Sequence, residues 1–276
     1  MDSLVNVPEA LEKLCVFLQS SVRSDISLDT TQLLFAPQKE AKHLSVEVEV
    51  AFLSSPPPHR VPLYILLPHK VMRGSICLIT PSPQHNFKDK ILALSEDGNE
   101  IAQSVKRVID TGKLRTKIVD PVSVRAFAKG YDNFVVYAVK KYPLQLTGEF
   151  LGHRRLPVWV SKKGPFVTSL SNATRTAVVS RRGNNSVTCC IGHTGLSVGQ
   201  IDENIRTFVE KLTKHPQGVA LKDVLHIRVA ATNAKGVRAG FPIFGQTFTF
   251  PSDRTTKGKR PREATSMDLN TTQCPS

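Results

Sequence analysis

One pentapeptide of the chain has the residue types and the spacing of a hydrolase nucleophile. Gly195-Leu-Ser-Val-Gly199 matches the Gly-x-Ser-x-Gly elbow, in which Ser197 would attack a carbonyl carbon with His193 or His226 as its base. An elbow needs the serine directly after a strand, with an acid and a histidine placed downstream, and the sequence lacks this arrangement. We therefore favour the alternative that Ser197 caps a helix, with Gln200 completing a capping box.

Cysteine thiols are the second candidate for chemistry. The chain contains Cys15, Cys77, Cys189, Cys190 and Cys274. An odd count without a Cys-x-x-Cys pair disfavours a disulfide framework and a four-ligand zinc site. Cys189, Cys190 and His193 could supply metal ligands, but adjacent side chains on a strand point to opposite faces. We expect buried, reduced thiols, no metal and a reducing compartment.

Phosphate-cradling glycine loops are the third candidate. Neither Gly-x-Gly-x-x-Gly nor Gly-x-x-x-x-Gly-Lys-Ser/Thr occurs in the sequence. We therefore expect no nucleotide cofactor and no small-molecule substrate, and we predict that the chain is not an enzyme.

Short basic clusters are the remaining feature. They are Lys140-Lys141, His153-Arg154-Arg155, Lys162-Lys163, Arg181-Arg182 and the group Arg228, Lys235 and Arg238. Any one cluster could simply be solvated surface. Taken together they favour contact with phosphates, and because aromatic residues make up only 7% and do not interleave with them, structured RNA is favoured over stacked single strands.

The charge balance supports a polyanionic partner. Thirty-seven Lys and Arg against 23 Asp and Glu give a net charge of +14. The net charge is −3 over residues 1–68, +7 over 69–159, +8 over 160–250 and +2 over 251–276. Nucleic acid is the first candidate partner and an anionic membrane the second. Because the sequence has no apolar stretch of about 18 residues and no signal-like start, we expect neither a membrane protein nor a secreted one.

The hydrophobic pattern predicts the elements that position these residues. Asn6-x-x-Glu9 resembles a capping box, and apolar residues at helical spacing predict a helix over 7–22. Residues 44–52 alternate strictly, which predicts a half-buried strand with Glu47 on its polar face. A second strand is expected over 61–67.

The middle of the chain alternates between apolar strands and helices. Strands are expected at 76–79, 117–119 and 134–138, and helices at 99–110, 121–129 and 142–151. This pattern is typical of a parallel sheet covered by helices. An antiparallel pattern then resumes, with a hairpin over 177–181 and 186–191, a helix carrying Ile201, Ile205, Phe208, Val209 and Leu212 on one face, and a strand over 225–231.

The predicted fold is an α+β split domain with an inserted α/β domain that is Rossmann-like and three-layered. The split domain would comprise residues 1–68 and 160–250, and the inserted domain residues 69–159. Residues 251–276 have the composition of a disordered basic tail, in which Lys257–Arg262 is interpreted as a nuclear-import patch or an unspecific phosphate clamp.

Several segments together resemble the ribosomal protein L-one family. They are Val61-Pro-Leu-Tyr-Ile-Leu-Leu-Pro-His69, Tyr131-Asp-Asn-Phe-Val-Val-Tyr137, Leu151-Gly-His-Arg-Arg-Leu-Pro157, Ile191-Gly-His-Thr-Gly195 and Glu203-Asn-Ile-Arg206. The match runs in order over about residues 1–245. Leu67-Pro-His69, Ile191-Gly-His193 and Phe241-Pro-Ile-Phe244 look most similar to the nucleolar ribosome-biogenesis branch.

The resemblance implies two domains and rRNA binding mainly by the split domain. The family uses a glutamate on the first strand and a Thr-Met-Gly loop after the last, and these positions correspond to Glu47 and Thr232-Asn233-Ala234. Because Thr232 is retained while the methionine and glycine are replaced, a paralogue that binds a precursor RNA is favoured. The further RNA contacts that we expect are Lys42, Arg154, Arg155, Lys162, Lys163, Arg228, Asn233, Lys235 and Arg238.

The function expected from the sequence is that of an rRNA-binding assembly factor in nucleolar pre-ribosomal particles. Its partners would be pre-rRNA or rRNA, assembly factors and ribosomal proteins, with the small-subunit processome favoured over pre-large subunits. The alternatives are a mature large-subunit ribosomal protein of the same fold and, from another class, a serine hydrolase using Ser197.

Overall fold

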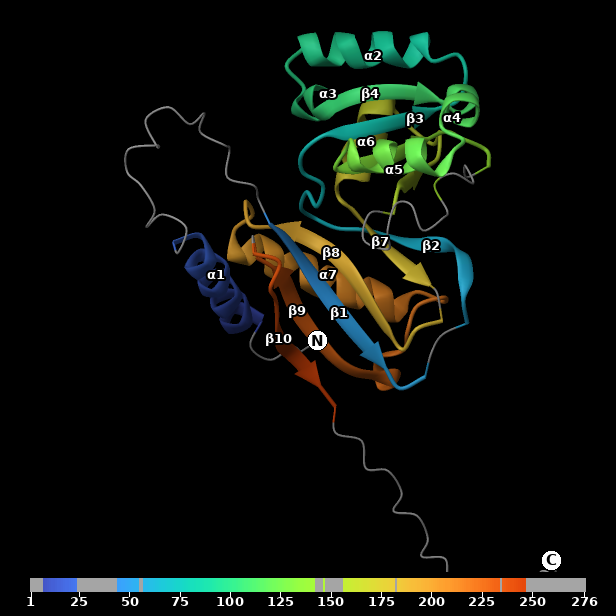
Figure 1. Ribbon diagram of the computed structural model, residues 1–276. Helices are drawn as coiled ribbons and strands as arrows, with labels where there is room; N and C mark the ends of the chain where they lie inside the picture. The colour runs from blue at the N-terminus through green and yellow to red at the C-terminus, as the bar shows by residue number, and fades with distance from the viewer. Residues whose placement is uncertain are drawn as a thin grey trace, which may run out of the picture. The chain divides into compact units, whose positions relative to one another are not determined.

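The antiparallel sheet is built around β1 (Ser45–Phe52), the strand with the clearest alternation in the sequence. The computed structural model describes residues 7–23, 44–54, 57–141, 146, 156–181, 183–233 and 235–246. In it, four strands form this sheet in the order β10-β9-β1-β8 (Figure 1). The partners of β1 are β8 (Ser186–His193), β9 (Val224–Thr232) and β10 (Arg238–Gly245). The strands predicted at 44–52 and 225–231 are confirmed.

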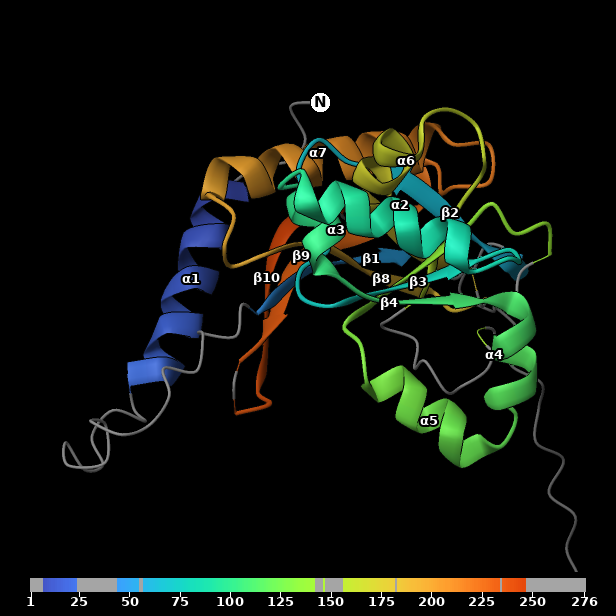
Figure 2. The ribbon, with the colours of Figure 1, turned by 90° about the horizontal axis from the view of Figure 1, so that it is seen from above.

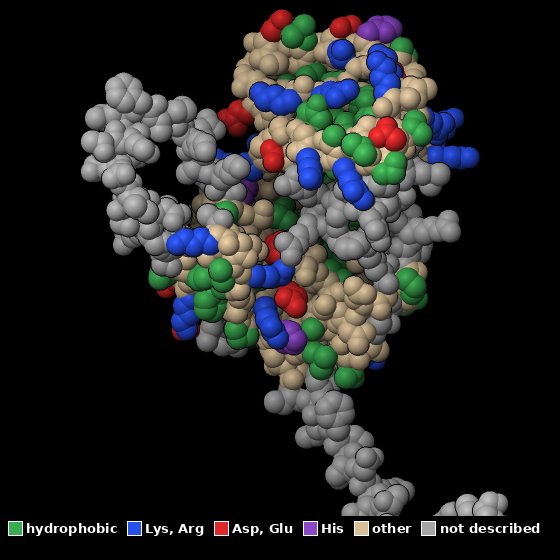
Figure 3. All heavy atoms as spheres, in the orientation of Figure 1, with side chains coloured by type: hydrophobic (Ala, Val, Ile, Leu, Met, Phe, Trp, Pro, Cys, Tyr) green, Lys and Arg blue, Asp and Glu red, His purple; other side chains and the backbone are tan. Residues whose placement is uncertain are grey.

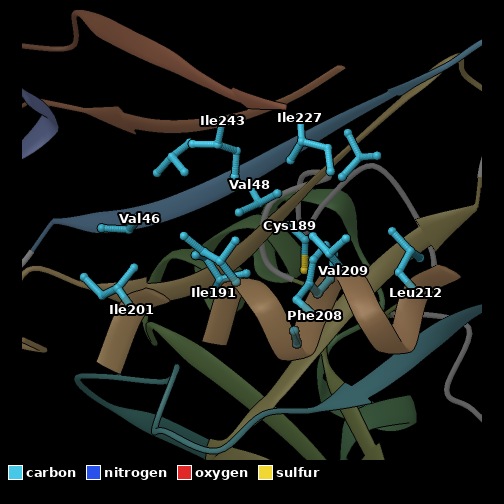
Figure 4. Packing of buried hydrophobic residues seen from close by; sticks show 14 of the residues in the cluster. Val46, Val48, Cys189, Ile191, Ile201, Phe208, Val209, Leu212, Ile227 and Ile243 are labelled. Carbon is cyan, nitrogen blue, oxygen red and sulfur yellow. The ribbon is translucent and has the colours of Figure 1, made fainter. Parts of the chain in front are cut away.

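One face of the antiparallel sheet carries the larger hydrophobic core. Val46 and Val48 alternate onto this face and are buried. Helices α1 (Val7–Arg23) and α7 (Val198–Lys214) cover it, and Figure 4 shows the apolar side of α7 against the sheet. Each fully buried aliphatic side chain stabilises the fold by roughly 1.5–3 kcal/mol. The helical spacing of apolar residues in the sequence predicts both helices, and both predictions are confirmed.

A second sheet is parallel and has the order β4-β3-β5-β6. Its strands are β3 (Ile76–Thr80), β4 (Val105–Asp110), β5 (Asn133–Tyr137) and β6 (Val158–Val160). Helices α2 (His85–Glu96), α3 (Glu100–Ser104) and α6 (Phe166–Thr174) pack on one face. Helices α4 (Thr111–Lys117) and α5 (Pro121–Lys129) pack on the other (Figure 2). The mixed α/β fold with a helix-covered parallel sheet is therefore as predicted.

The predicted hairpin is wrong in its pairing. β7 (Thr176–Arg181) pairs with β2 (His59–Leu66) in a separate two-stranded sheet, whereas β8 pairs with β1. The Gly/Asn turn at 183–185 therefore leads from one sheet into another, because these pairings bury Val179 of β7 and Ile191 of β8 in the larger core.

Two assignments in the middle of the chain are also wrong. The helix predicted at 99–110 ends at Ser104, and β4 follows it, because Val108 and Ile109 are buried beside β3. Burial in the sheet outweighs the local helical pattern. The strand predicted at 117–119 is not formed: Lys117 ends α4, and residues 118–119 follow it outside any helix or strand. The helix begins where the Asp110 carboxylate accepts a hydrogen bond from the Lys113 amide at 2.6 Å.

The predicted domain boundaries remain predictions. Met1–Gln246 clusters as one compact unit, and the core of the parallel sheet includes Leu170 and Ala173 of α6, beyond the crossing expected near residue 160. Apart from residue 146, the helix expected at 142–151 lies outside the described residues, as does the tail from 251. Among the described helices, none has the length and apolarity needed to cross a membrane.

Candidate nucleic-acid interface

The antiparallel sheet has a second face that points away from the core, and we call it the outer face. Its side chains, which alternate with the buried ones, include Glu47, Glu49, Thr188, Cys190, His226, Arg228 and Arg238. Figure 3 shows basic, acidic and histidine side chains over β1, β9 and β10. Because strand side chains alternate, the sequence could place Glu47 and Arg228 on this face in advance.

Arg238 of β10 reaches across β9 to the carboxylates of β1. Its Nη2 lies 3.2 Å from Glu47 Oε2 and 3.7 Å from Glu49 Oε2. The Glu47 oxygen is buried, and it lies within ion-pair distance of Arg238 without the alignment of a hydrogen bond. The Arg238 guanidinium thus compensates the charge of the partly desolvated Glu47 carboxylate. Any contact of Arg238 with a phosphate would compete with this internal ion pair.

The turn between β9 and β10 holds the positions that correspond to the family's Thr-Met-Gly loop. Asn233 is buried, and its Oδ1 accepts a hydrogen bond from the Val237 amide at 2.8 Å. The Asn233 amide in turn donates to the Val237 carbonyl at 2.9 Å. Gly236 has φ of +82°, a conformation that favours glycine. Asn233 therefore shapes the turn, while Lys235 is exposed on it.

A groove of about 680 Å³ lies on the outer face along β9 and β10. It is lined by His226, Arg228, Gly240, Pro242, Ile243, Phe244 and Gly245. Burial lowers the pKa of His226, and the nearby Arg228 charge lowers it further, against the opposing effect of Glu49. The lowered pKa favours the neutral form of the His226 imidazole, which lies beside the Arg228 guanidinium in this groove. The sequence pattern predicts neither the groove nor β10.

The remaining predicted contacts that the structure describes lie away from this face. Lys162 and Lys163 are exposed on the loop between β6 and α6, which belongs to the parallel sheet. Lys42, Arg154 and Arg155 lie outside the described residues. Among the predicted contacts that the structure describes, it brings together those on β1, β9, β10 and the turn between the last two.

Ser197 is a helix cap, as the favoured interpretation of its motif predicts. Its Oγ accepts a hydrogen bond from the Gln200 amide at 3.2 Å, and the Gln200 side chain accepts one from the Ser197 amide at 3.0 Å. His226 lies on the outer face, whereas α7 covers the opposite face. The sheet therefore separates Ser197 from one proposed base, and the other, His193, accepts a hydrogen bond from the Gly195 amide through Nδ1.

The thiols fit a structural role. Burial raises the pKa of Cys189, and it raises the pKa of Cys190 to about 11 and that of Cys77 to about 12. Thiols with raised pKa are poor nucleophiles and poor metal ligands at neutral pH. Within the described residues, no group of three or more His, Cys, Asp or Glu side chains could hold a metal ion.

Comparison with known proteins agrees with these features. A model of the ribosomal protein L1p/L10e family matches residues 31–235. The mixed α/β fold is therefore that of an RNA-binding, ribosomal-protein-like domain. The chain belongs to the ribosomal protein L1p/L10e family, the family that the sequence motifs predict. The family is generally non-enzymatic. No curated protein sequence matches the chain significantly.

Proposed function

We propose that the chain is a non-enzymatic assembly factor that binds structured pre-rRNA in nucleolar pre-ribosomal particles. Membership of an RNA-binding ribosomal protein family is the observation that supports it most directly. The replaced Thr-Met-Gly loop favours a precursor RNA over the mature ribosome, because Asn233 uses its side chain to close the turn where the family has methionine. We favour the small-subunit processome, with Lys257–Arg262 as the nuclear-import patch.

The outer face would act through separate charged and polar contacts. Arg228 and Lys235 would neutralise phosphates, and Thr232 at the end of β9 would contact sugar or phosphate oxygens. Glu47, held by Arg238, would accept hydrogen bonds from ribose hydroxyls. We further propose a split domain that carries this face, with a second domain inserted into it. Because α6 packs on the parallel sheet, the inserted domain would extend beyond the predicted 69–159 to include α6.

The test is a filter-binding titration of structured rRNA with Arg228→Gln/Lys235→Gln. Its matched control, Lys13→Gln/Lys214→Gln, removes the same charge from α1 and α7, where both lysines form exposed ion pairs with glutamates four residues away. Each phosphate contact that is lost should make the log–log salt slope shallower by about 0.9 on a duplex. Equal binding by the two variants would remove the outer face from the RNA site.

A mature large-subunit ribosomal protein is the rival within the same family. Sedimentation of cell extracts separates the two, because an assembly factor should travel with precursor particles and be absent from translating polysomes. Recovery of the chain in polysomes would overturn the biogenesis role and leave RNA binding intact.

A further inference from the structure

A second basic groove lies on the parallel sheet, along the free edge of β4. β4 is the terminal strand in the order β4-β3-β5-β6, and a groove of about 530 Å³ follows it between α2 and α4. Its charged lining consists of Lys88, Lys106, Arg107, Lys113 and Lys117. Figure 3 shows basic side chains over α2 and β4.

The lining has one sign of charge. No carboxylate is among the described residues that line this groove, and residues 105–117 carry five basic side chains against one acidic. That acidic residue, Asp110, uses its carboxylate to cap α4. A concave surface with several cations and no facing carboxylate attracts a polyanion.

The hydrogen bonds of Gln84 distinguish an RNA backbone from an acidic peptide as the polyanion that this groove would bind. The Gln84 Nε2 donates a hydrogen bond to the carbonyl of Val108 at the edge of β4, and its Oε1 accepts one from Lys113 Nζ at 2.7 Å. An acidic peptide that added to the sheet as a strand would need that carbonyl. Phosphates need no backbone acceptor, so the groove fits an RNA backbone better than a peptide strand.

We propose that this groove, which we call the β4 groove, binds the phosphates of an RNA strand as a second contact away from the outer face. The proposal rests on the RNA-binding function proposed above and extends it to the parallel sheet. Lys88 from α2, Lys106 from β4 and Lys117 from α4 are exposed and converge on the groove from three elements. Contacts of this type position an RNA without reading its sequence.

The test compares Lys88→Gln/Lys106→Gln/Lys117→Gln with the matched control Lys13→Gln/Lys129→Gln/Lys214→Gln. Both triple variants remove three exposed lysines, and Arg107 is left in place because it lies 6.0 Å over the Phe127 ring. Thermal melting checks that both variants are folded. Structured rRNA is then titrated at several salt concentrations, and photocrosslinked peptides are mapped on the wild-type chain.

The β4-groove variant should bind more weakly than the control, with a salt slope shallower by up to about 2.7, which is 0.9 for each of three contacts. Crosslinked peptides should include residues 105–117. If the β4-groove variant binds RNA as tightly as the control, the proposed role of the β4 groove is wrong. RNA binding by the wild-type chain would in that case still support the proposed function. If the variant keeps its RNA affinity but loses affinity for polyglutamate, the groove is a protein site and the proposal is wrong. If the wild-type chain binds no RNA, both proposals fail.

Discussion

Arg238 and Glu47 face each other across an intervening strand, with Nη2 and Oε2 3.2 Å apart. The strand register explains this diagonal contact. Glu47 is opposite Ala230 on β9, and Ala230 is opposite Gly240 on β10, which lies two residues from Arg238. The small side chains between them leave room for the guanidinium. The ion pair thus ties β10 to the centre of the sheet on the face proposed to bind RNA.

Removing Arg238 should destabilise the chain more than removing Glu47. Arg238→Met leaves the carboxylate of Glu47, a side chain that is only 14% exposed, without its cation, and should lower the free energy of unfolding by about 2 kcal/mol. Glu47→Gln should cost under about 1 kcal/mol, because Arg238 keeps Glu49 and solvent. Urea unfolding of the two single variants and the double variant measures the coupling. Strictly additive effects would show that the pair contributes nothing.

A buried amide on α7 supports the second stability prediction. Asn204 is fully buried, with its Oδ1 accepting from the His69 amide at 3.0 Å and its Nδ2 donating to the Ile191 carbonyl at 2.8 Å. Asn204→Leu leaves both backbone groups unsatisfied and should lower the free energy of unfolding by about 3 kcal/mol. The neighbouring Glu203→Gln is the control, since the Glu203 side chain is 64% exposed and its contact with His69 should contribute little. Similar urea midpoints for both variants would contradict the structural role of Asn204.

Alternation and helical spacing predict most of this fold because they report directly which face of an element is buried. Glu47 and Arg228 could be placed on the outer face for that reason. The ion pair to Arg238 could not be predicted, because Gly240, Pro242 and Gly245 obscure the strand pattern of β10. The β4 groove was equally hidden, since the sequence pattern of 99–110 indicates a helix and only pairing with β3 makes β4 a strand.

Thiol reactivity should follow burial. At pH 7.5 the raised pKa of Cys77, of Cys189 and of Cys190 keeps these groups protonated, so iodoacetamide should label them only after unfolding. Mass spectrometry of tryptic peptides, with and without urea, gives the extent of labelling at each site. Rapid labelling of Cys189 in the native chain would contradict its place in the core.

His226 should link RNA binding to pH. Its pKa lies below the ordinary value because of burial and of Arg228 on the same strand, while Glu49 on β1 opposes the shift and the groove residues of β10 carry no charge. In the free chain, the unfolded state takes up a proton on His226 more readily than the folded state does. The contribution of His226 to the free energy of unfolding is therefore fully present above pH 6.5 and is lost as the pH falls through its lowered pKa. A phosphate in the groove would instead favour the charged imidazole.

The two effects have opposite signs, which makes them separable. Between pH 7.5 and pH 5.5, the affinity for structured rRNA should rise in the wild-type chain more than in His226→Gln, whereas the free energy of unfolding should fall more in the wild type than in that variant. His85→Gln, at the exposed start of α2, should behave as the wild type in both measurements. A pH dependence of RNA affinity that is the same in the wild-type and His226→Gln chains would place the bound phosphates away from the groove of β9 and β10.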